Sequence, residues 1–298
     1  MTYIGRFAPS PTGSLHIGSL VTAVGSYIHA KQFGGKWVLR IEDIDQIRTA
    51  PGATDSILKT LDAYQLEWDG EIRYQSPETK HYIKVAEKLI LQGLAFKCSC
   101  SRKKLKMVNN DSNAIGIRCQ SNCWTEENQL GPTSIRVIAD SSNINFVDYL
   151  QGIQKCNLFN CMGDYVIVRR DSVPSYHLAT VLSDDLQGIT TIVRGIDLLE
   201  LTAIHIHLQQ ILRLQTPNYL HLPVIVNSKG QKLSKQTGAA PVDNTDTTNI
   251  AVKVLNYLGL QAPKELIGSQ PKELWNWAIK NWDPKILNNK KQLKIDTL

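Results

Sequence analysis

Hydrophobic and polar positions at the start of the chain follow a pattern that predicts short strands joined by helices. Residues 3–8 form a short, largely apolar segment that ends at a turn with two prolines. Residues 17–32 follow with apolar positions at helical spacing, and glycines at 34 and 35 are typical of a helix end. Residues 37–41 form a second apolar segment. This order of strand, turn, helix and strand predicts a βαβ unit and a parallel sheet.

The rest of the chain continues this alternation, with one interruption. Helices are expected at residues 54–64, 80–91, 176–182, 198–212, 248–258 and 271–280, and strands at 134–138, 144–147, 165–169 and 189–193. Between residues 98 and 124 the periodicity is lost in a polar segment that carries cysteines. After residue 241 the pattern changes to two helical stretches and a lysine-rich tail. An α/β protein with an irregular insertion and a helical end is therefore expected.

Composition excludes a long disordered region and a membrane span. Of the 298 residues, 42% are hydrophobic and 20% are charged, which is typical of a globular protein. The opening residues predict no secretory signal, and no apolar run approaches the length of a membrane span. The net charge of +6 permits a polyanionic partner without requiring one. We therefore expect a cytoplasmic protein that has no membrane partner. A monomer is expected as well, but no feature of the sequence determines the oligomeric state.

The turn after the first strand is suited to binding phosphate. Pro11 and Gly13 predict a tight turn before a helix, and the N–H groups at a helix start bind phosphate readily. Gly13 and Gly18 let the backbone approach a nucleotide closely. His16 stands where it could donate a hydrogen bond to a phosphate oxygen. A lone histidine at a helix start is more often a cap, and that alternative remains open.

A second basic segment, KLSKQ at residues 232–236, lies between Gly230 and Gly238. Lys232 and Lys235 could neutralise a leaving pyrophosphate in the transition state. Taken alone, the segment would more simply be a solvated loop. Both motifs, in this order and among βαβ units, favour an ATP site.

Four of the six cysteines stand in two close pairs. Cys98 and Cys100 form one pair, and Cys119 and Cys123 form the other. Four thiolates at such spacings can surround a tetrahedral zinc ion, although four unrelated thiols are the alternative. The remaining residues, Cys156 and Cys161, are interpreted as ordinary thiols.

The motif at residues 16–19 and the KLSKQ segment together resemble the signatures of a known family. His16-Ile17-Gly18-Ser19 and KLSKQ at 232–236 resemble the HIGH-type and KMSKS-type signatures of the class I aminoacyl-tRNA synthetases. Residues 6–18, together with Arg40-Ile41-Glu42-Asp43-Ile44-Asp45, resemble the glutamyl/glutaminyl branch, and the likeness covers roughly residues 3–236. The chain departs from the signatures at Ser19, which replaces a second histidine, and at Gln236, which replaces a final serine or arginine.

The resemblance implies a Rossmann-type parallel sheet and a division of the chain. Its catalytic domain would occupy residues 1–97 and 161–240, with a zinc-bearing, acceptor-facing insertion at 98–160. A small helical domain would follow at 241–298, without an anticodon-binding domain. ATP with Mg²⁺ would be the energy source and one structural Zn²⁺ the only resident metal. The insertion is similar to that of short relatives of the glutamyl branch, which often have a tyrosine at the position of Cys119.

The resemblance also implies a glutamate pocket. Glutamate carries two carboxylates and one ammonium group, which suit arginine forks and an acid such as Arg6, Arg194 and Glu42 at the ends of predicted strands. Without the resemblance, Glu42 would be a surface acid and Tyr176 a core residue. The implied glutamate-binding residues are Arg6, Phe7, Ala8, Pro9, Ser10, Glu42, Tyr176 and Arg194. The implied ATP-binding residues are Pro11, Gly13, His16, Gly18, Lys232 and Lys235, of which His16, Lys232 and Lys235 are catalytic. The implied zinc ligands are Cys98, Cys100, Cys119 and Cys123.

The length of the segment after Gln236 indicates which molecule would receive the activated amino acid. Its short length resembles the glutamyl-queuosine tRNA(Asp) synthetases, which are truncated relatives of glutamyl-tRNA synthetase. That likeness implies activation of L-glutamate without tRNA and its transfer to the queuosine base in the anticodon loop of tRNA(Asp). The alternatives are a synthetase that glutamylates the 3′ end of tRNA, a non-catalytic tRNA-binding paralogue, and a nucleotidyltransferase of another pathway. Candidate RNA contacts, or simply a solvated helical face, are Lys285, Lys290, Lys291 and Lys294.

Five polar residues receive no functional role from the sequence. His205 and His207 lie in an apolar helical pattern and are interpreted as helix surface or as satisfied core residues. Asp184, Asp185 and Asp197 have no assigned role.

Overall fold

The computed structural model of the chain describes residues 2–101, 103, 105, 119, 123, 131–233 and 239–294. Lys235 and Gln236 of the second motif lie outside the described residues. The strands are β1 (Ile4–Phe7), β2 (Lys36–Ile41), β3 (Arg73–Tyr74), β4 (Ala95–Cys98), β5 (Ser134–Val137), β6 (Asn143–Asp148), β7 (Gly152–Asn157), β8 (Tyr165–Val168), β9 (Thr191–Gly195), β10 (Asn218–Leu222), β11 (Val224–Val226) and β12 (Gln292–Lys294). The helices are α1 (Ile17–Gln32), α2 (Ala53–Ala63), α3 (Thr79–Leu91), α5 (Leu158–Cys161), α6 (Tyr176–Leu186), α7 (Thr202–Leu212), α8 (Thr247–Tyr257) and α9 (Pro271–Asn281).

Parallel strands form the middle of the molecule. β1 pairs with β2 and β2 pairs with β3, all in parallel. On the other side of β1, the Thr190 N–H donates to the Ile4 carbonyl at 2.9 Å, and β9, which follows, pairs in parallel with β10. The sheet of β1, β2 and β3 therefore adjoins the sheet that contains β9 and β10, with β1 next to β9. Ligands of such folds bind at the carboxyl ends of the strands, where the strand order reverses.

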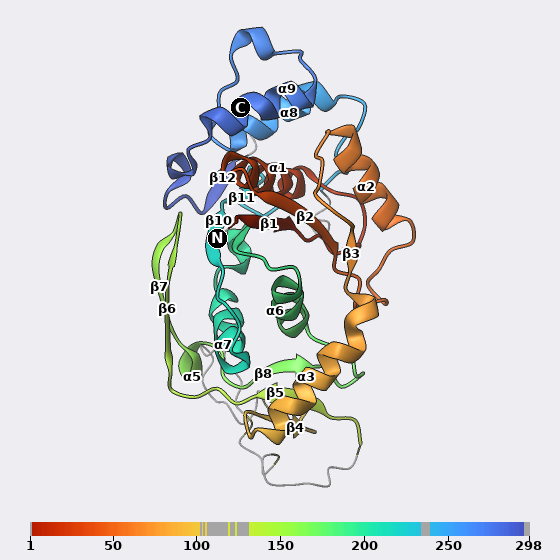
Figure 1. Cartoon of the computed structure of the whole chain (residues 1–298), viewed down its shortest axis with the longest axis vertical. Helices are drawn as coiled ribbons and strands as arrows, with labels where there is room; N and C mark the ends of the chain where they lie inside the picture. The colour runs from red at the N-terminus through yellow and green to blue at the C-terminus, as the bar shows by residue number, and fades with distance from the viewer. Residues whose placement is uncertain are drawn as a thin grey trace.

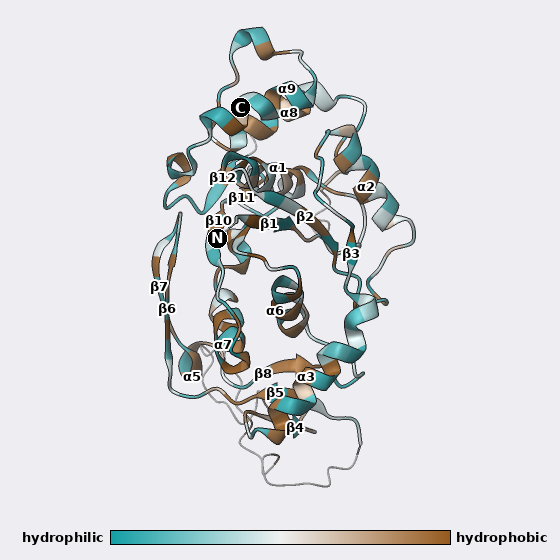
Figure 2. Cartoon of the chain, viewed as in Figure 1, coloured by the Kyte–Doolittle hydropathy of each residue, from teal (hydrophilic) through white to brown (hydrophobic). Residues whose placement is uncertain are grey.

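Other elements lie at both ends of this sheet. The antiparallel strands β4, β5 and β8 form a small sheet at one end of the molecule, and α8 and α9 lie at the other end beside α1 (Figure 1). β6 and β7 form an antiparallel hairpin, and β6 joins β10 through the pair Tyr219–Asp148. Figure 2 shows mixed hydrophilic and hydrophobic residues on α8 and α9, whereas β8 is predominantly hydrophobic. Among the helices of the described ranges, none is long and apolar enough to cross a membrane.

Helix α1 forms where the apolar periodicity predicts it. Its positions Leu20, Val24 and Ile28 are fully buried between the sheet and the C-terminal helices. A Cβ on Gly25 would stand 2.7 Å from Leu222 Cδ1 and 3.1 Å from Leu258 Cδ2, so a larger residue there would require these side chains to shift. The helix ends before Gly34, which has a left-handed φ of 61°.

The expected helices are all present, and three expectations on element bounds need correction. The helix expected at 198–212 begins only at Thr202, because residues 196–198 form a separate 3-10 turn after β9. Helix α6 continues beyond the expected end at residue 182 to Leu186, since Asp184 is buried against arginines rather than exposed. The strand expected at 189–193 is displaced to Thr191–Gly195. Six strands, β3, β4, β7, β10, β11 and β12, and the four-residue helix α5 were not predicted. In β10 the polar residue His221 occupies a fully buried position between Leu220 and Leu222.

The C-terminal helices belong to the same core as α1. Trp275 of α9 is fully buried, and its Nε1 donates to the Tyr64 carbonyl at 2.7 Å. Trp282 follows the helix and donates from Nε1 to His29 Nδ1 at 3.1 Å. These contacts fix α9 against both α1 and the end of α2.

Replacing Trp275 with Ala should lower the free energy of unfolding by about 3–5 kcal/mol, because it removes a large buried side chain and leaves a cavity. Asn276→Ala is the matched control, since Asn276 is the exposed neighbour on the same helix. It should change stability by less than about 0.5 kcal/mol. Urea unfolding of both variants measures the difference, and a Trp275→Ala loss below about 1 kcal/mol would show that α9 packs differently.

Candidate active site

The first motif folds as a turn and a helix cap. Gly13 has a φ of 138°, a backbone conformation that favours glycine. His16 is the N-cap of α1, and its Nδ1 accepts from the Ser19 N–H at 3.2 Å. The Ser19 hydroxyl lies 3.2 Å from His16 Nε2. His16 therefore caps α1, and Ser19, one of the two departures from the family signature, holds the imidazole; a role of His16 toward phosphate stays a prediction.

The two motifs lie next to one another. A Cβ on Gly18 would stand 3.2 Å from the His16 ring and 3.9 Å from the Leu233 carbonyl oxygen. Lys232 Nζ lies 2.6 Å from Asp197 Oδ2, beyond the carboxyl end of β9. Asp197, which had no role in the sequence analysis, thus contacts one of the predicted catalytic lysines. Lys235 lies outside the described residues.

Arg6, Arg40, Glu42 and Asp184 form a buried charge network at the carboxyl ends of β1 and β2. Asp184 Oδ1 accepts from Arg6 Nε at 3.3 Å and from Arg40 Nη1 at 2.7 Å. Glu42 Oε1 accepts from Arg40 Nη2 at 3.2 Å and from the Thr180 hydroxyl at 3.2 Å. Burial acts to raise the pKa of the Asp184 carboxyl, but the Arg40 and Arg6 guanidiniums outweigh it and hold this pKa below its usual range. Two positive and two negative charges therefore share one buried network.

Arg194, on β9, is held by a second polar network. Its side chain is buried, and its guanidinium lies 5.5 Å from the centre of the Tyr219 ring. Its N–H groups contact His221 Nε2 at 3.0 Å, His205 Nδ1 at 3.2 Å, Tyr176 OH at 3.5 Å, Thr202 Oγ1 at 2.8 Å and the Leu198 carbonyl at 3.3 Å. These partners come from strand β10, helices α6 and α7 and the turn that follows β9. The orientation of Arg194 therefore depends on several elements at once.

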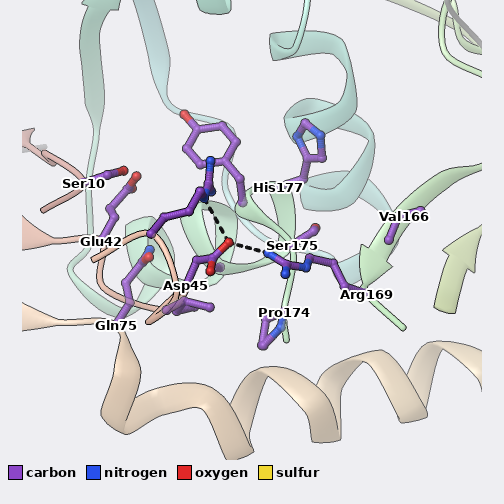
Figure 3. Close-up of a pocket in the computed structure, with 13 residues that line it drawn as sticks. Ser10, Glu42, Asp45, Gln75, Val166, Arg169, Pro174, Ser175 and His177 are labelled. Carbon is purple, nitrogen blue, oxygen red and sulfur yellow. Dashed lines mark hydrogen bonds and ion pairs between the residues drawn. The ribbon is translucent and has the colours of Figure 1, made fainter. Parts of the chain in front are cut away.

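A pocket of about 270 Å³ opens beside these networks (Figure 3). Ser10, Glu42 and Tyr176 line it, whereas Arg6 and Arg194 are buried and do not line it; Arg194 contacts Tyr176. The structure thus brings together five of the eight predicted glutamate-binding residues. The other three predicted residues, Phe7, Ala8 and Pro9, do not line the pocket. Phe7 packs its ring against Trp37, and the Pro9 carbonyl accepts from the Glu42 N–H at 3.0 Å.

The pocket also has charged walls that the sequence analysis did not assign. Asp45 pairs with Arg169 and, at 2.9 Å, with Arg48 (Figure 3). Gln75 and His177 line the pocket as well. Asp45 belongs to the RIEDID segment that carried the resemblance, so a signal for it was present. Arg169, Gln75 and His177 stand in no recognisable motif.

The two helix histidines are both core residues, and the surface interpretation is wrong. His207 Nδ1 lies 2.7 Å from Tyr165 OH, and neither residue lines the pocket. His205 is 1% exposed and contacts Arg194, so it belongs to the surroundings of the site. The tail lysines, Lys285, Lys290, Lys291 and Lys294, are exposed, as both interpretations of them require.

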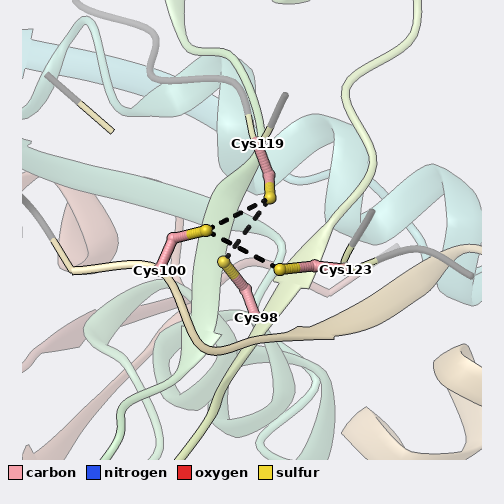
Figure 4. Close-up of side chains that lie close together, drawn as sticks. All are labelled: Cys98, Cys100, Cys119 and Cys123. Carbon is pink, nitrogen blue, oxygen red and sulfur yellow. Dashed lines mark hydrogen bonds between the residues drawn. The ribbon is translucent and has the colours of Figure 1, made fainter. Parts of the chain in front are cut away.

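The four predicted metal ligands converge in the insertion (Figure 4). Their sulfur atoms all lie within 4.8 Å of one another, with separations of 3.7 Å for Cys98–Cys119, 3.8 Å for Cys100–Cys119 and 3.7 Å for Cys100–Cys123. A tetrahedral zinc ion with bonds of about 2.3 Å sets its sulfurs about 3.8 Å apart, so this donor set fits Zn²⁺. Asp164 accepts from the Cys119 N–H at 3.0 Å and from the Ala139 N–H at 3.1 Å, which ties the cluster to the chain that follows β5.

Replacing Asp184 with Asn should destabilise the protein by about 3–5 kcal/mol near neutral pH, because Arg6 and Arg40 would remain buried with one anion fewer. Asp185→Asn is the control, since Asp185 is the exposed neighbour on α6. A carboxyl whose pKa is lowered by folding stabilises the native state above its unfolded pKa, and that contribution disappears as the pH falls through its folded pKa. Urea unfolding at pH 7 and at acidic pH should therefore show a difference between wild type and Asp184→Asn that shrinks on acidification; a pH-independent difference would contradict the account.

Comparison with known proteins agrees with this geometry. Residues 4–265 match the family model of the catalytic domain of class I tRNA synthetases (E and Q). The glutamyl-Q tRNA(Asp) synthetase of Ectopseudomonas mendocina is 43% identical over 284 residues, which cover 94% of this chain and 93% of that protein. The protein of the same name from a Synechococcus species is 41% identical over 278 residues, covering 92% of this chain and 93% of the relative.

Solved structures show the same fold. A glutamate tRNA ligase from Elizabethkingia meningosepticum, crystallised with its amino acid, superposes with a TM-score of 0.78 at 25% identity, over 98% of this chain and 67% of that chain. The glutamate-tRNA synthetase of Elizabethkingia anophelis gives a TM-score of 0.79 at 25% identity, over 99% of this chain and 69% of that chain. The chain therefore belongs to the class I tRNA synthetases of the glutamyl and glutaminyl group, within the family of the glutamyl-Q tRNA(Asp) synthetases.

Proposed function

We propose that this enzyme activates L-glutamate with ATP and Mg²⁺, without tRNA, and transfers it to the queuosine base in the anticodon loop of tRNA(Asp). The observation that carries this proposal is the match to relatives named glutamyl-Q tRNA(Asp) synthetase, at 40 to 43% identity over nearly the full length of both chains. The pocket supports the proposal because its charges suit glutamate.

The charge distribution favours an amino acid with two carboxylates. Arg194 has no carboxylate partner among the described residues, so its positive charge is not cancelled, and one carboxylate of the substrate would replace a neutral hydrogen-bond partner. Arg6 lies at 3.3 Å from Asp184, a loose pairing that a second carboxylate could share. Glu42 lines the pocket and offers an anion to the ammonium group. Ser10 stands on the same wall as a neutral hydrogen-bond donor.

The first step joins glutamate to AMP. An oxygen of the α-carboxylate attacks the α-phosphorus of ATP, the bond to the bridging oxygen breaks, and pyrophosphate leaves with its negative charge. His16, Lys232 and Lys235 would stabilise the charge that builds up on the phosphates, and the turn at Pro11 and Gly13 would seat them. The contact between Asp197 and Lys232 would hold that lysine until ATP replaces the carboxylate as its partner.

The second step moves the glutamyl group to the nucleic acid. A hydroxyl of the cyclopentene ring of queuosine attacks the carbonyl carbon of glutamyl-adenylate, AMP leaves, and an ester forms as the hydroxyl loses its proton. An opened anticodon loop would present the base, since RNA-binding proteins recognise unpaired bases through shape and stacking.

We also propose that Cys98, Cys100, Cys119 and Cys123 hold one structural Zn²⁺. The sulfur separations match those of a tetrahedral zinc site, and the cluster is buried. The metal would crosslink two segments that are far apart in the insertion, and the chemistry of glutamate activation would not involve it.

Metal analysis of the purified protein should find about one zinc per chain, and Cys119→Ser should lose it because one of four ligands is removed. Cys156→Ser is the matched control, since Cys156 lies outside the cluster, and it should retain the metal. The zinc-free variant should also unfold at a lower temperature. Wild-type protein without zinc after gentle purification would overturn the metal assignment.

The function is tested by transfer of labelled glutamate to tRNA(Asp) with queuosine, to the same tRNA with guanosine in its place, and to tRNA(Glu). Only the queuosine-containing tRNA should become labelled, because only it offers the cyclopentene hydroxyl. Equal labelling of both forms of tRNA(Asp), or labelling of tRNA(Glu), would instead support 3′-end glutamylation.

Lys235→Ala serves as the inactive control for that experiment. It should reduce glutamate-dependent ATP–pyrophosphate exchange by about 100- to 1,000-fold, the usual effect of removing one group that stabilises transition-state charge. Unchanged exchange would contradict the assignment of the second motif to the ATP site.

A further inference from the structure

The partners of Arg194 set it apart from the other buried arginines of the site. Arg6 and Arg40 both contact the carboxylate of Asp184. Within the described part of the chain, Arg194 forms no ion pair, and all its hydrogen-bond partners are imidazole, hydroxyl or carbonyl groups. Burial lowers the pKa of His221 to about 4, so this imidazole is neutral near pH 7. No direct partner therefore cancels the charge of Arg194.

The contact with His221 fixes the position of the proton on that imidazole. An arginine side chain has donors only, so the Nε2 of His221, 3.0 Å from Arg194 Nε, must be the nitrogen that accepts. The proton of the neutral ring then stands on Nδ1, which lies 2.6 Å from Asp148 Oδ2. Both side chains are fully buried, so these contacts are shielded from bulk solvent.

The backbone around Asp148 determines which oxygen faces His221. Oδ1 accepts from three backbone N–H groups, those of Leu150 at 3.0 Å, Gln151 at 2.9 Å and His221 at 3.3 Å. Oδ2 is left to accept from His221 Nδ1. The turn that follows β6 therefore presents an acceptor, and never a donor, to the imidazole.

We propose that Asp148 and His221 are positioning residues that aim the guanidinium of Arg194 at a carboxylate of the amino-acid substrate. Asp148 selects the Nδ1–H tautomer of His221, and His221 fixes Arg194 Nε through its lone pair. The Nη1 group contacts Tyr176 OH at 3.5 Å, the longest of its hydrogen bonds, and Tyr176 lines the pocket. This N–H is the one that a substrate carboxylate captures most readily. The proposal rests on the proposed glutamate activation.

The choice of a histidine at this position has a physical reason. A carboxylate placed directly on Arg194 would orient it equally well but would cancel its charge and compete with the substrate. The neutral ring of His221 orients Arg194 and stands between its guanidinium and the carboxylate of Asp148. This arrangement resembles the way in which a carboxylate orients a metal-binding histidine through its second nitrogen.

The first test compares two replacements of His221 in glutamate-dependent ATP–pyrophosphate exchange. His221→Leu removes the acceptor and should raise the KM for glutamate about 10- to 100-fold, the loss expected for a hydrogen bond to a charged group, with the KM for ATP and kcat within about 3-fold of wild type. His221→Gln carries an oxygen as many bonds from Cα as Nε2 and should keep the KM for glutamate within about 3-fold of wild type. Equal losses in the two variants, failure of His221→Gln to fold, or a parallel loss in the KM for ATP would overturn the proposal.

The second test uses Asp148→Asn, which decides the matter even if His221→Leu does not fold. The amide oxygen of the introduced asparagine would keep the three backbone contacts, so its NH2 group would face His221 and move the ring proton to Nε2, against Arg194 Nε–H. The KM for glutamate should rise in this variant. A glutamine side chain has no ring proton that Asp148 could position. In the His221→Gln background, Asp148→Asn should therefore raise the KM for glutamate by less than about one third as much as it does in the wild-type background. Equal effects in both backgrounds would refute the role of the tautomer.

A third measurement separates this proposal from the proposed function. In protein with ¹⁵N-labelled histidine, the ring nitrogens of His221, assigned by their loss in His221→Gln, should show a proton on Nδ1 in wild type and on Nε2 in Asp148→Asn. An Nε2–H tautomer in wild type would overturn the positioning proposal whatever the exchange assay gives. Wild-type protein that shows the Nδ1–H tautomer but no glutamate-dependent exchange would instead contradict the proposed function.

Discussion

The pairing of Asp184 with two arginines from neighbouring strands is the interaction on which the site depends. Arg6 and Arg40 stand on β1 and β2, and the carboxylate of Asp184 on α6 contacts both. Two guanidiniums buried beside each other would repel one another without this anion. These ion pairs therefore fix α6 against the sheet. Helix α6 in turn places Tyr176 at the pocket and the Thr180 hydroxyl beside Glu42. One buried carboxylate thus joins the stability of the fold to the shape of the site.

The buried arginines beside the pocket differ in whether an acidic side chain neutralises their charge. Arg6 and Arg40 lie within a network of balanced charge, whereas Arg194 is held by neutral groups. In the first network the charges of the arginines and the acids compensate one another within the protein. The second leaves one positive charge available at a fixed place, which is what the binding of an anionic substrate requires. A charge-balanced network therefore lies on β1 and β2, and a network of neutral partners surrounds Arg194 on β9.

The sequence predicted the parts of this structure that have a local signal. The apolar period of residues 17–32 predicted α1, and the paired cysteines predicted a cluster whose four sulfurs converge. Asp184, Asp148 and His221 were not predicted, because their role comes from contacts across 178 residues in one case and 73 in another. Such contacts leave no periodicity and no motif. Asp184 also led to a wrong helix boundary: the helix was expected to end at residue 182, before this acidic residue, whereas α6 continues to Leu186. The family motifs supplied Arg6, Glu42 and Arg194, but not the residues that hold them.

The central claim is that the pocket selects glutamate and activates it before any tRNA is bound. It is tested most directly by ATP–pyrophosphate exchange in the absence of tRNA with glutamate, glutamine and aspartate compared at equal concentration. The account predicts exchange with glutamate at a kcat/KM at least about 100-fold above that for glutamine, because an uncharged amide cannot replace a carboxylate beside a buried arginine. Equal exchange with glutamine, or none with glutamate until tRNA is added, would contradict it.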